Sequence, residues 1–403
     1  MNRLAFVFGL FVWVGCGDDA AGDVGVRDVG SASDAAREDA SRQDAGRQDA
    51  GPAPDGSGSI ATRNDDGTIS IDFAPEPGAA PALSPTIAQL TYIGGPGDQY
   101  VRSVGFAEDG SVVAQGEGFT LTFAPDGSGG AIEGDVGAND EGDFARRPNL
   151  PGDPGQEYVD TRNGLSYTVG FRQAGGNLQI PIFRAFEGGE RIWLLWGHAV
   201  NDVRDADLGA DSRCYQAWAM PDGNIGVQCW TDGGNSVLTK GPRDLTTPGF
   251  NPSWAEGAFQ NSAGGMSSMV ALVDPSDGGS VISGTFMNSH VGHLTTDGWG
   301  RLYIAQVAGS RFGGGEPANP FGQSGDARSG VMVLDPTLRN VLFNARIGGT
   351  CSDGLQAFGD VAVRGDLLVA GGTTCASDLA TVNAIQASPG GGQDGMVLIL
   401  RLR

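Results

Sequence analysis

Histidine and basic residues are scarce in this 403-residue chain, and the shortage excludes some classes of function. The three histidines are His198, His290 and His293, and 25 Lys and Arg stand against 48 Asp and Glu. The formal charge of −23 repels phosphate backbones and anionic lipid headgroups. We therefore expect no nucleic-acid partner, and any membrane attachment must come from something other than a basic surface.

The usual signatures of catalysis are also missing. The chain has no Gly-x-Ser-x-Gly elbow and no Cys-x-x-Cys-His haem site. Gly390, Gly392 and Gly395 match a dinucleotide-binding spacing, but no strand-to-helix unit surrounds them. His290 and His293 have an odd separation, which in extended chain points them to opposite faces. The sequence therefore predicts no catalytic residue and no cofactor.

Long hydrophobic runs are absent, and the one apolar stretch is short. It covers residues 4–14, too few to span a bilayer core of roughly 30 Å, and fits a secretory signal peptide over residues 1–15. Gly15-Cys16 at its end resembles the lipobox of bacterial lipoproteins, although Trp13 stands where that family usually has an aliphatic residue. The resemblance implies cleavage before Cys16, acylation of its thiol and membrane attachment through that lipid. Ordinary secretory cleavage beside a chance cysteine is the alternative.

Residues 16–58 have almost no large apolar side chains. They are mainly Asp, Ala, Gly, Ser and Arg, and a five-residue unit recurs at 37–41, 42–46 and 47–51. Such a segment buries too little surface to offset its ordering entropy, so we predict a disordered linker. Residues 59–89 are transitional, with one strand expected at 68–73.

From residue 90 onward the residue pattern is typical of an all-β protein. The chain carries 68 glycines, and short β-branched and aromatic runs alternate with Asp-Gly and Pro-Asp turn signals. Hairpins are predicted at 101–115, 215–230 and 361–370. No segment shows the pattern of a convincing amphipathic helix.

These hairpins recur at long range. Met269 to Pro275 returns as Gly330 to Pro336, roughly 60 residues later, and Ile93-Gly94-Gly95 returns as Ile347-Gly348-Gly349. Together with the segments 90–98, 371–386 and 394–397, they resemble the bacterial SBBP-type β-propeller repeat family. The likeness covers residues 90–124 and 268–403, and residues 134–263 depart from it.

The expected fold is therefore a β-propeller over residues 90–403, with about five or six four-stranded blades. Leu90 to Ile93 reads as the outer strand of a blade, and the chain ends at 396–402 with the strand that precedes it. Pairing these two strands would complete one blade from both ends of the chain and close the ring, which removes exposed strand edges.

Four cysteines remain when Cys16 is set aside. An even number in an exported chain favours disulfides over free thiols or zinc. Counting outward from a turn at 220–223 brings Cys214 opposite Cys229 within bonding range. Cys351 and Cys375 flank the last hairpin and form the second predicted bridge.

Two polar segments are candidate sites. Asp211, Arg213, Asp232 and Asn235 lie around turns in a region that departs from the repeat, where grafted function often sits, and form a candidate ligand face. The acidic loop with Asp135, Asn139, Glu141 and Asp143 offers oxygen ligands for calcium but lacks the glycine of an EF-hand, and a solvated loop is the alternative.

The sequence thus predicts an exported, lipid-anchored envelope protein at the outer membrane or cell surface. Its propeller is expected to act as a non-catalytic binding or structural module for a protein or polysaccharide. The alternative is a propeller hydrolase or lyase acting on polysaccharide, with Asp211, Arg213 and Asp232 as candidate residues.

Overall fold

The computed structural model describes residues 58–137, 155–174, 178–246, 267–287, 291–306, 329–351 and 356–403. The chain divides into two units, residues 1–48 and 49–403, and every described residue belongs to the second.

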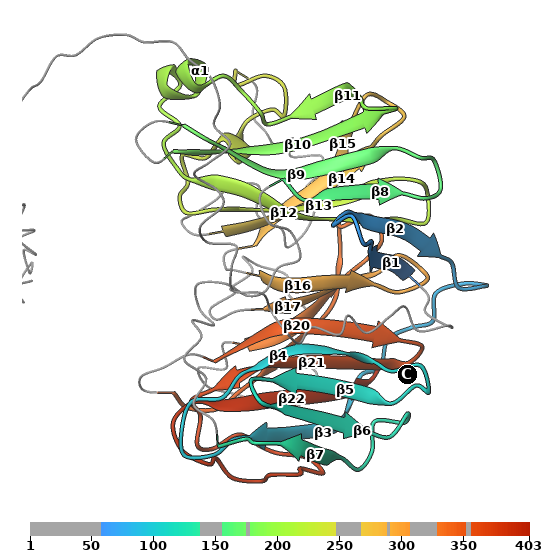
Figure 1. Cartoon of the computed structure of the whole chain (residues 1–403), viewed down its shortest axis with the longest axis vertical. Coiled ribbons are helices and arrows are strands. Elements are labelled where there is room, and N and C mark those ends of the chain that lie inside the picture. Colours follow the sequence, from blue (N-terminus) through green and yellow to red (C-terminus); the bar gives the residue numbers. More distant parts are fainter. Residues whose placement is uncertain are drawn as a thin grey trace, which may run out of the picture. The chain divides into compact units, whose positions relative to one another are not determined.

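The described residues form an all-β structure with five sheets (Figure 1). Four sheets contain four antiparallel strands each. The strands of these sheets, in spatial order, are β4 (Val101–Phe106), β5 (Val112–Gly116), β6 (Phe119–Phe123) and β7 (Ala131–Gly134); β12 (Ser212–Ala219), β13 (Ile225–Thr231), β14 (Ser267–Asp274) and β15 (Ser280–Met287); β16 (Val291–Thr296), β17 (Leu302–Gln306), β18 (Ser329–Leu334) and β19 (Val341–Ile347); and β20 (Ala357–Arg364), β21 (Leu367–Thr374), β22 (Asp394–Arg401) and β3 (Thr86–Ile93).

The fifth sheet has six strands and includes the segment that the sequence left as transitional. Its order is β1 (Gly58–Arg63), β2 (Ile69–Ala74), β8 (Glu157–Asp160), β9 (Ser166–Gln173), β10 (Gln179–Glu187) and β11 (Glu190–Leu195). The expected strand at 68–73 is β2, and it pairs with β1 in a hairpin that the sequence analysis missed. β2 then joins β8 in parallel and buries Ile69 and Ile71 in the core of this sheet.

The predicted pairing of the two terminal strands is confirmed. β3 pairs antiparallel with β22, with Leu90 opposite Leu398 and Ile93 opposite Gly395. Figure 1 shows this sheet, in which the edge strand β3 comes from the early part of the described chain, after β1 and β2, and its neighbour β22 from the end. β22 is buried along almost its whole length, because β21 and β3 flank it and other sheets cover both of its faces.

The three predicted hairpins are also confirmed as β4–β5, β12–β13 and β20–β21. In β12–β13 the turn closes with Met220 N–H donating to Asn224 O at 3.0 Å, and Gly223 adopts a φ of +88°. That left-handed conformation suits glycine, which has no Cβ to clash.

The long-range repeat corresponds to recurrent hydrogen bonds. Gly95 N–H donates to Gln99 Oε1 at 2.9 Å, and Gly349 N–H donates to Gln356 Oε1 at 3.1 Å. Asp274 and Asp335 likewise accept backbone N–H groups after β14 and β18, from Ser276 and other residues of the turns. The repeated sequence segments therefore form the same turns in successive sheets.

Two short helices interrupt the strands of the described part. They are α1 (Val200–Asp205) and the 3-10 turn η2 (Val237–Thr239). The sequence predicted no helix, and α1 is too short to leave an amphipathic period of its own. Ala199 precedes it without a side-chain cap, and Val203 is its buried anchor.

Candidate functional site

The Arg213 cluster consists of Arg213 and three aromatic rings from three strands. The Arg213 Cζ atom lies 4.8 Å from the ring centroid of Trp230 on β13, 5.7 Å from Tyr215 on β12 and 5.8 Å from Phe171 on β9. All four residues are partly exposed. A guanidinium over aromatic faces is attracted by their negative π clouds.

The guanidinium has no acidic partner within the described part of the chain. No ion pair joins Arg213 to a described carboxylate, and its Nε atom is buried without a hydrogen-bond partner there. The rings therefore hold the charge while its planar hydrogen-bonding edge is left uncommitted. Such an edge is a ready donor for oxygen atoms.

A disulfide fixes the register on which this cluster depends. Cys214 and Cys229 are bonded as predicted, with Cα atoms 3.8 Å apart. Arg213 and Trp230 are the next cross-strand pair, so the bridge holds the guanidinium opposite the indole. Cross-strand partners on one face of an antiparallel pair contact each other directly.

The other three residues of the predicted face lie on two adjoining turns. Asp211 precedes β12, and its Oδ1 atom accepts the Gln179 N–H at 2.9 Å. Asp232 follows β13, and its N–H donates to Asp211 O at 3.0 Å. Asn235 is exposed further along this loop and accepts the Ala210 N–H through its backbone oxygen at 3.4 Å.

Electrostatics link these residues to Arg213. Partial burial raises the pKa of the Asp232 carboxyl, the nearby charge of Asp211 raises that pKa further, and Arg213 acts in the opposite direction. The four residues of the predicted ligand face therefore lie near one another, but they do not all have the same role. Asp211 is engaged with the backbone, whereas Asp232 is exposed and Arg213 is partly exposed.

The loop that carries Asp232 and Asn235 is tied down at both ends. Gly233 N–H donates to Thr231 Oγ1 at 3.3 Å, and the hydroxyl groups of Ser212 and Ser236 lie 2.6 Å apart. Ser236 also caps η2 by accepting the Leu238 N–H at 3.0 Å. These buried contacts hold the exposed loop residues in one arrangement.

A feature that the sequence analysis missed recurs in the first strand of every four-stranded sheet. β4, β12, β16 and β20 each contain a bulge against the second strand. The bulges fall between Val101 and Ser103, Cys214 and Gln216, Val291 and Leu294, and Phe358 and Asp360. A bulge re-aims the side chains beside it and often accompanies functional positions.

Polar side chains at three of these bulges connect their strands. His293 Nδ1 lies 2.7 Å from Asp360 Oδ1, and His293 Nε2 lies 3.4 Å from Gln216 Nε2. Gln216 also donates to Leu294 O at 3.2 Å, and Asp360 Oδ2 accepts the Val104 N–H at 2.8 Å. We call Gln216, His293 and Asp360 the bulge triad. It joins β12, β16, β20 and β4.

Two glycines permit this approach. A Cβ on Gly292 would lie 2.3 Å from Gly359 O, so the backbones of β16 and β20 touch where neither residue has a side chain. His293 and Asp360 follow these glycines directly. The Gly-His and Gly-Asp pairs were the available sequence signal, but they stand far apart in the chain and match no known motif.

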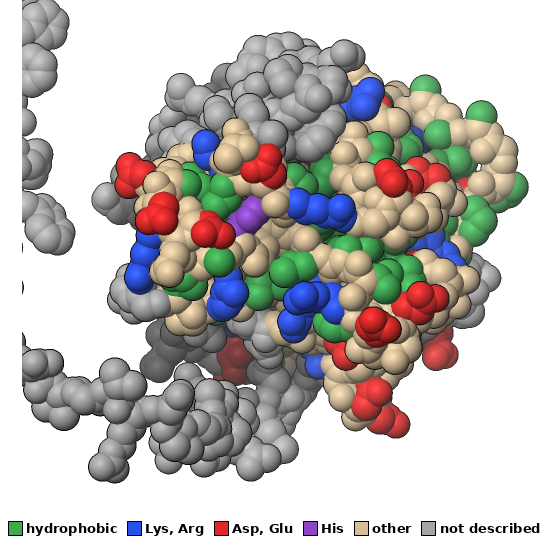
Figure 2. Space-filling view, turned by 90° about the horizontal axis from the view of Figure 1, so that it is seen from above, with side chains coloured by type: hydrophobic (Ala, Val, Ile, Leu, Met, Phe, Trp, Pro, Cys, Tyr) green, Lys and Arg blue, Asp and Glu red, His purple; other side chains and the backbone are tan. Residues whose placement is uncertain are grey.

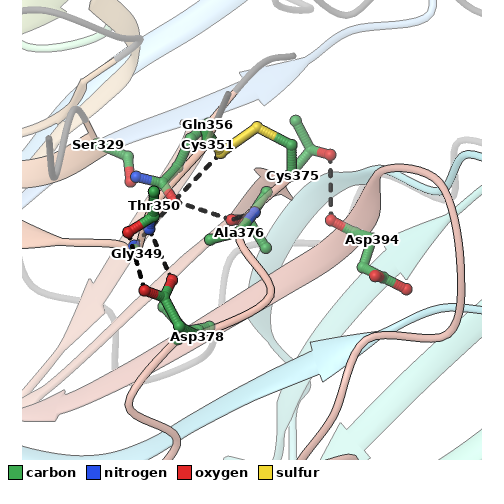
Figure 3. Close-up of a disulfide and its surroundings, with 12 residues drawn as sticks. Ser329, Gly349, Thr350, Cys351, Gln356, Cys375, Ala376, Asp378 and Asp394 are labelled. Carbon is green, nitrogen blue, oxygen red and sulfur yellow. Dashed lines mark hydrogen bonds between the residues drawn. A yellow bond between two sulfur atoms is a disulfide. The ribbon is translucent and has the colours of Figure 1, made fainter. Parts of the chain in front are cut away.

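The second disulfide lies at the end of the sheet formed by β20, β21, β22 and β3. Cys351 and Cys375 are bonded as predicted, with Cα atoms 5.5 Å apart. Figure 3 shows the bridge beside Gln356 and close to Thr350, whose hydroxyl donates to Asp378 at 2.9 Å. This surrounding network ties the loops on either side of the bridge together.

The remaining predicted positions give mixed outcomes. Asp135 caps its own turn by accepting the Gly137 N–H at 2.8 Å, while Asn139, Glu141 and Asp143 lie outside the described residues. Cys16 and His290 also lie outside them. No group of three potential metal ligands occurs in the described ranges, and no helix there is long and apolar enough to cross a membrane.

Figure 2 shows how charge is distributed on one face of the molecule. Acidic and basic side chains are interspersed among the described residues of that face, with apolar groups between them. The strong net negative charge of the whole chain is therefore not expressed there as one continuous acidic surface. The two disulfides indicate an oxidising location, extracellular or periplasmic.

The chain matches no protein-family model and no curated protein. Solved structures give only distant likenesses. A protein of unknown function from Dyadobacter fermentans has a TM-score of 0.38 and 11% identity, with 79% of this chain and 99% of that chain covered. A levansucrase from B. megaterium has a TM-score of 0.25 and 9% identity, with 80% and 82% covered. The Neurospora crassa Pan2 WD40 domain has a TM-score of 0.21 and 11% identity, with 80% and 98% covered. At these scores the likeness says nothing about function.

Proposed function

We propose that this chain is an exported, lipid-anchored β-propeller that binds a ligand at the Arg213 cluster without transforming it. The blades are the four-stranded sheets, with the six-stranded sheet as a fifth, and the pairing of β3 with β22 supports a ring closed between the two ends of the chain. The disulfides support export. Lipid on Cys16 supplies the anchor.

One observation carries the binding role. The Arg213 guanidinium is held by three aromatic rings, yet it forms no ion pair with a described carboxylate. A partly buried cation without an ion-pair partner is costly unless something else interacts with it. Surface-exposed aromatic and arginine side chains are also the types enriched where proteins bind partners.

The contacts of Asp211 favour binding over hydrolysis. An acid–base mechanism on a glycosidic bond needs two carboxyl groups that both face the substrate. Asp211 already accepts a backbone N–H from β10, which gives it a positioning role, and only Asp232 of the pair is directed outward. The hydrolase alternative therefore lacks its second carboxyl at this place.

Thermal-shift measurements on a compound panel test the binding role. The panel contains oligosaccharides, dipeptides, amino acids and nucleotides, and the proteins are the exported chain, Arg213→Lys and the matched control Arg184→Lys. Arg184 also lies over an aromatic ring, Phe186, at 5.3 Å, but on β10. Lysine keeps the charge and loses the planar fork of donors.

We expect at least one compound class to raise the melting temperature of the parent and of Arg184→Lys, but not of Arg213→Lys. If every stabilising compound acts equally on all three proteins, the Arg213 cluster is not the binding site. Unligated melting temperatures of the three proteins show whether each variant is folded.

A further inference from the structure

The ligand class can be inferred from the hydrogen-bonding groups around Arg213. The guanidinium presents donors only, and its planar edge is uncommitted within the described chain. Asp232 presents acceptors only. Its N–H bond to Asp211 O continues the β12–β13 register, so Asp232 lies two residues beyond Trp230, the cross-strand partner of Arg213. Asn235, on the same anchored loop, can both donate and accept.

Adjacent donor and acceptor groups match neighbouring hydroxyl groups. A hydroxyl donates one hydrogen and accepts at its oxygen, so two on adjacent carbons can receive from a guanidinium and donate to a carboxylate together. The carbon-bound face of a sugar ring also suits the partly exposed rings of Trp230 and Tyr215. Few other biological ligands repeat this combination.

The charges of the site narrow the class of ligand further. A cationic ligand would compete with Arg213, which already occupies the space between the three rings. A polyanionic ligand would approach two carboxylates, Asp211 and Asp232, on a chain of charge −23. A neutral ligand neither competes with Arg213 nor is repelled by the two carboxylates.

Resting on the proposed function, we infer that the Arg213 cluster binds neutral polysaccharide, with vicinal hydroxyl groups held between Arg213 and Asp232. Arg213 donates to hydroxyl oxygens and Asp232 accepts their hydrogens. The Cys214–Cys229 bridge and the Ser212–Ser236 contact hold the two sides of the site apart at a fixed separation.

Affinity electrophoresis tests this inference with named probes. Native gels contain either a neutral polysaccharide (dextran, galactomannan or xyloglucan) or an acidic one (polygalacturonate or alginate). The proteins are the exported chain, Arg213→Lys, Asp232→Asn and the control Arg184→Lys. Asp232 is exposed, and its structural contact uses the backbone N–H, so Asp232→Asn should fold normally.

We expect at least one neutral polysaccharide to retard the parent and Arg184→Lys. Binding by Arg213→Lys and Asp232→Asn should be roughly tenfold to a hundredfold weaker, because Arg213→Lys loses the planar fork of donors and Asp232→Asn loses the charged acceptor. Retardation by acidic polysaccharide alone, lost in Arg213→Lys, would overturn the neutral ligand class and leave the binding role intact. If no polysaccharide retards the parent while Arg213-dependent compounds appear in the thermal-shift panel, the carbohydrate inference is wrong and the proposed function stands. If neither assay shows dependence on Arg213, both are wrong.

Discussion

At the scale of single residues, Asp360 shows how one carboxylate can join several strands. Its Oδ2 atom accepts the Val104 N–H from β4 at 2.8 Å, and its Oδ1 atom accepts the Val361 N–H at 3.0 Å and lies 2.7 Å from His293 Nδ1. Only 13% of its side chain is exposed. A buried N–H that loses its acceptor costs the full desolvation penalty of that group.

Replacing Asp360 with Ala should therefore lower the free energy of unfolding by about 1 to 3 kcal/mol, because the Val104 N–H loses its partner. Asp360→Asn is the matched control, since its amide oxygen can still accept that hydrogen bond. Urea titration of the three proteins measures the effect. An Asp360→Ala protein as stable as the parent would show that the carboxylate holds no strands together.

The candidate site was only partly predictable from the sequence. The cross-strand pairing of Cys214 with Cys229 follows from counting along one hairpin, and this also places Arg213 opposite Trp230. The contribution of Phe171 comes from a different sheet, so no local pattern reveals it. The contact between His293 and Asp360 joins residues of separate sheets and depends on Gly292 and Gly359, whose meaning appears only when the strands touch.

At the scale of elements, the hairpin β12–β13 couples stability to the site. Its disulfide closes a separation of 15 residues and fixes the cross-strand pair that carries the cluster. The second disulfide closes a separation of 24 residues in another sheet and has no contact with Arg213. The two bridges therefore form a matched pair for experiment.

Removing either bridge by a double Cys→Ser change should cost about 3 kcal/mol of unfolding free energy in the chain-entropy model. The two double variants should differ in ligand affinity. The Cys214→Ser/Cys229→Ser protein should bind more weakly, because Arg213 and Trp230 lose their enforced register, whereas Cys351→Ser/Cys375→Ser should bind as the parent does. Chemical denaturation and affinity electrophoresis under oxidising conditions provide the two measurements, and equal affinity in both variants would contradict the coupling.

The fold itself was predictable where turns and alternating strands carry it. Asp-Gly and Pro-Asp signals located the hairpins, and the repeated Asp-Pro and Gly-Gly segments proved to be equivalent turns. The β1–β2 hairpin was missed because Gly58–Arg63 contains only one large apolar residue, Ile60, and so shows no alternating strand pattern. The bulges in β4, β12, β16 and β20 were missed because one extra residue in a strand leaves no distinct residue type.

The last strand makes a further prediction at this scale. β22 lies between β21 and β3, so deleting residues 396–403 would leave β3 without its strand partner and β21 paired on one side only, with β20. We expect the truncated chain to lose its cooperative unfolding transition, with early exposure of tryptophan. Removing only residue 403, which is exposed and follows β22, provides the control. A deletion of 396–403 that melts like the parent would contradict the proposed closure between the two ends of the chain.

At the scale of the whole molecule, the linker and the net charge bear on how the protein is held in place. A chain of charge −23 has no electrostatic attraction for anionic lipid, so attachment to a membrane requires a lipid of its own. With the proposed lipid on Cys16, a flexible linker of the composition of residues 16–58 would lengthen the tether of a polysaccharide-binding module.

Cys16 is the residue on which this arrangement rests, and labelling tests it directly. In a bacterial host grown with labelled palmitate, the parent should carry the label, and Cys16→Ser should be unlabelled and released in soluble form. The resemblance to the lipobox places Trp13 at an aliphatic position, so Trp13→Leu should increase the labelled fraction.

The other four cysteines are paired in disulfides and cannot substitute for Cys16 as the acceptor, so label on Cys16→Ser would show a different attachment. An unlabelled parent that fractionates like Cys16→Ser would refute the anchor and leave an exported propeller free of the membrane.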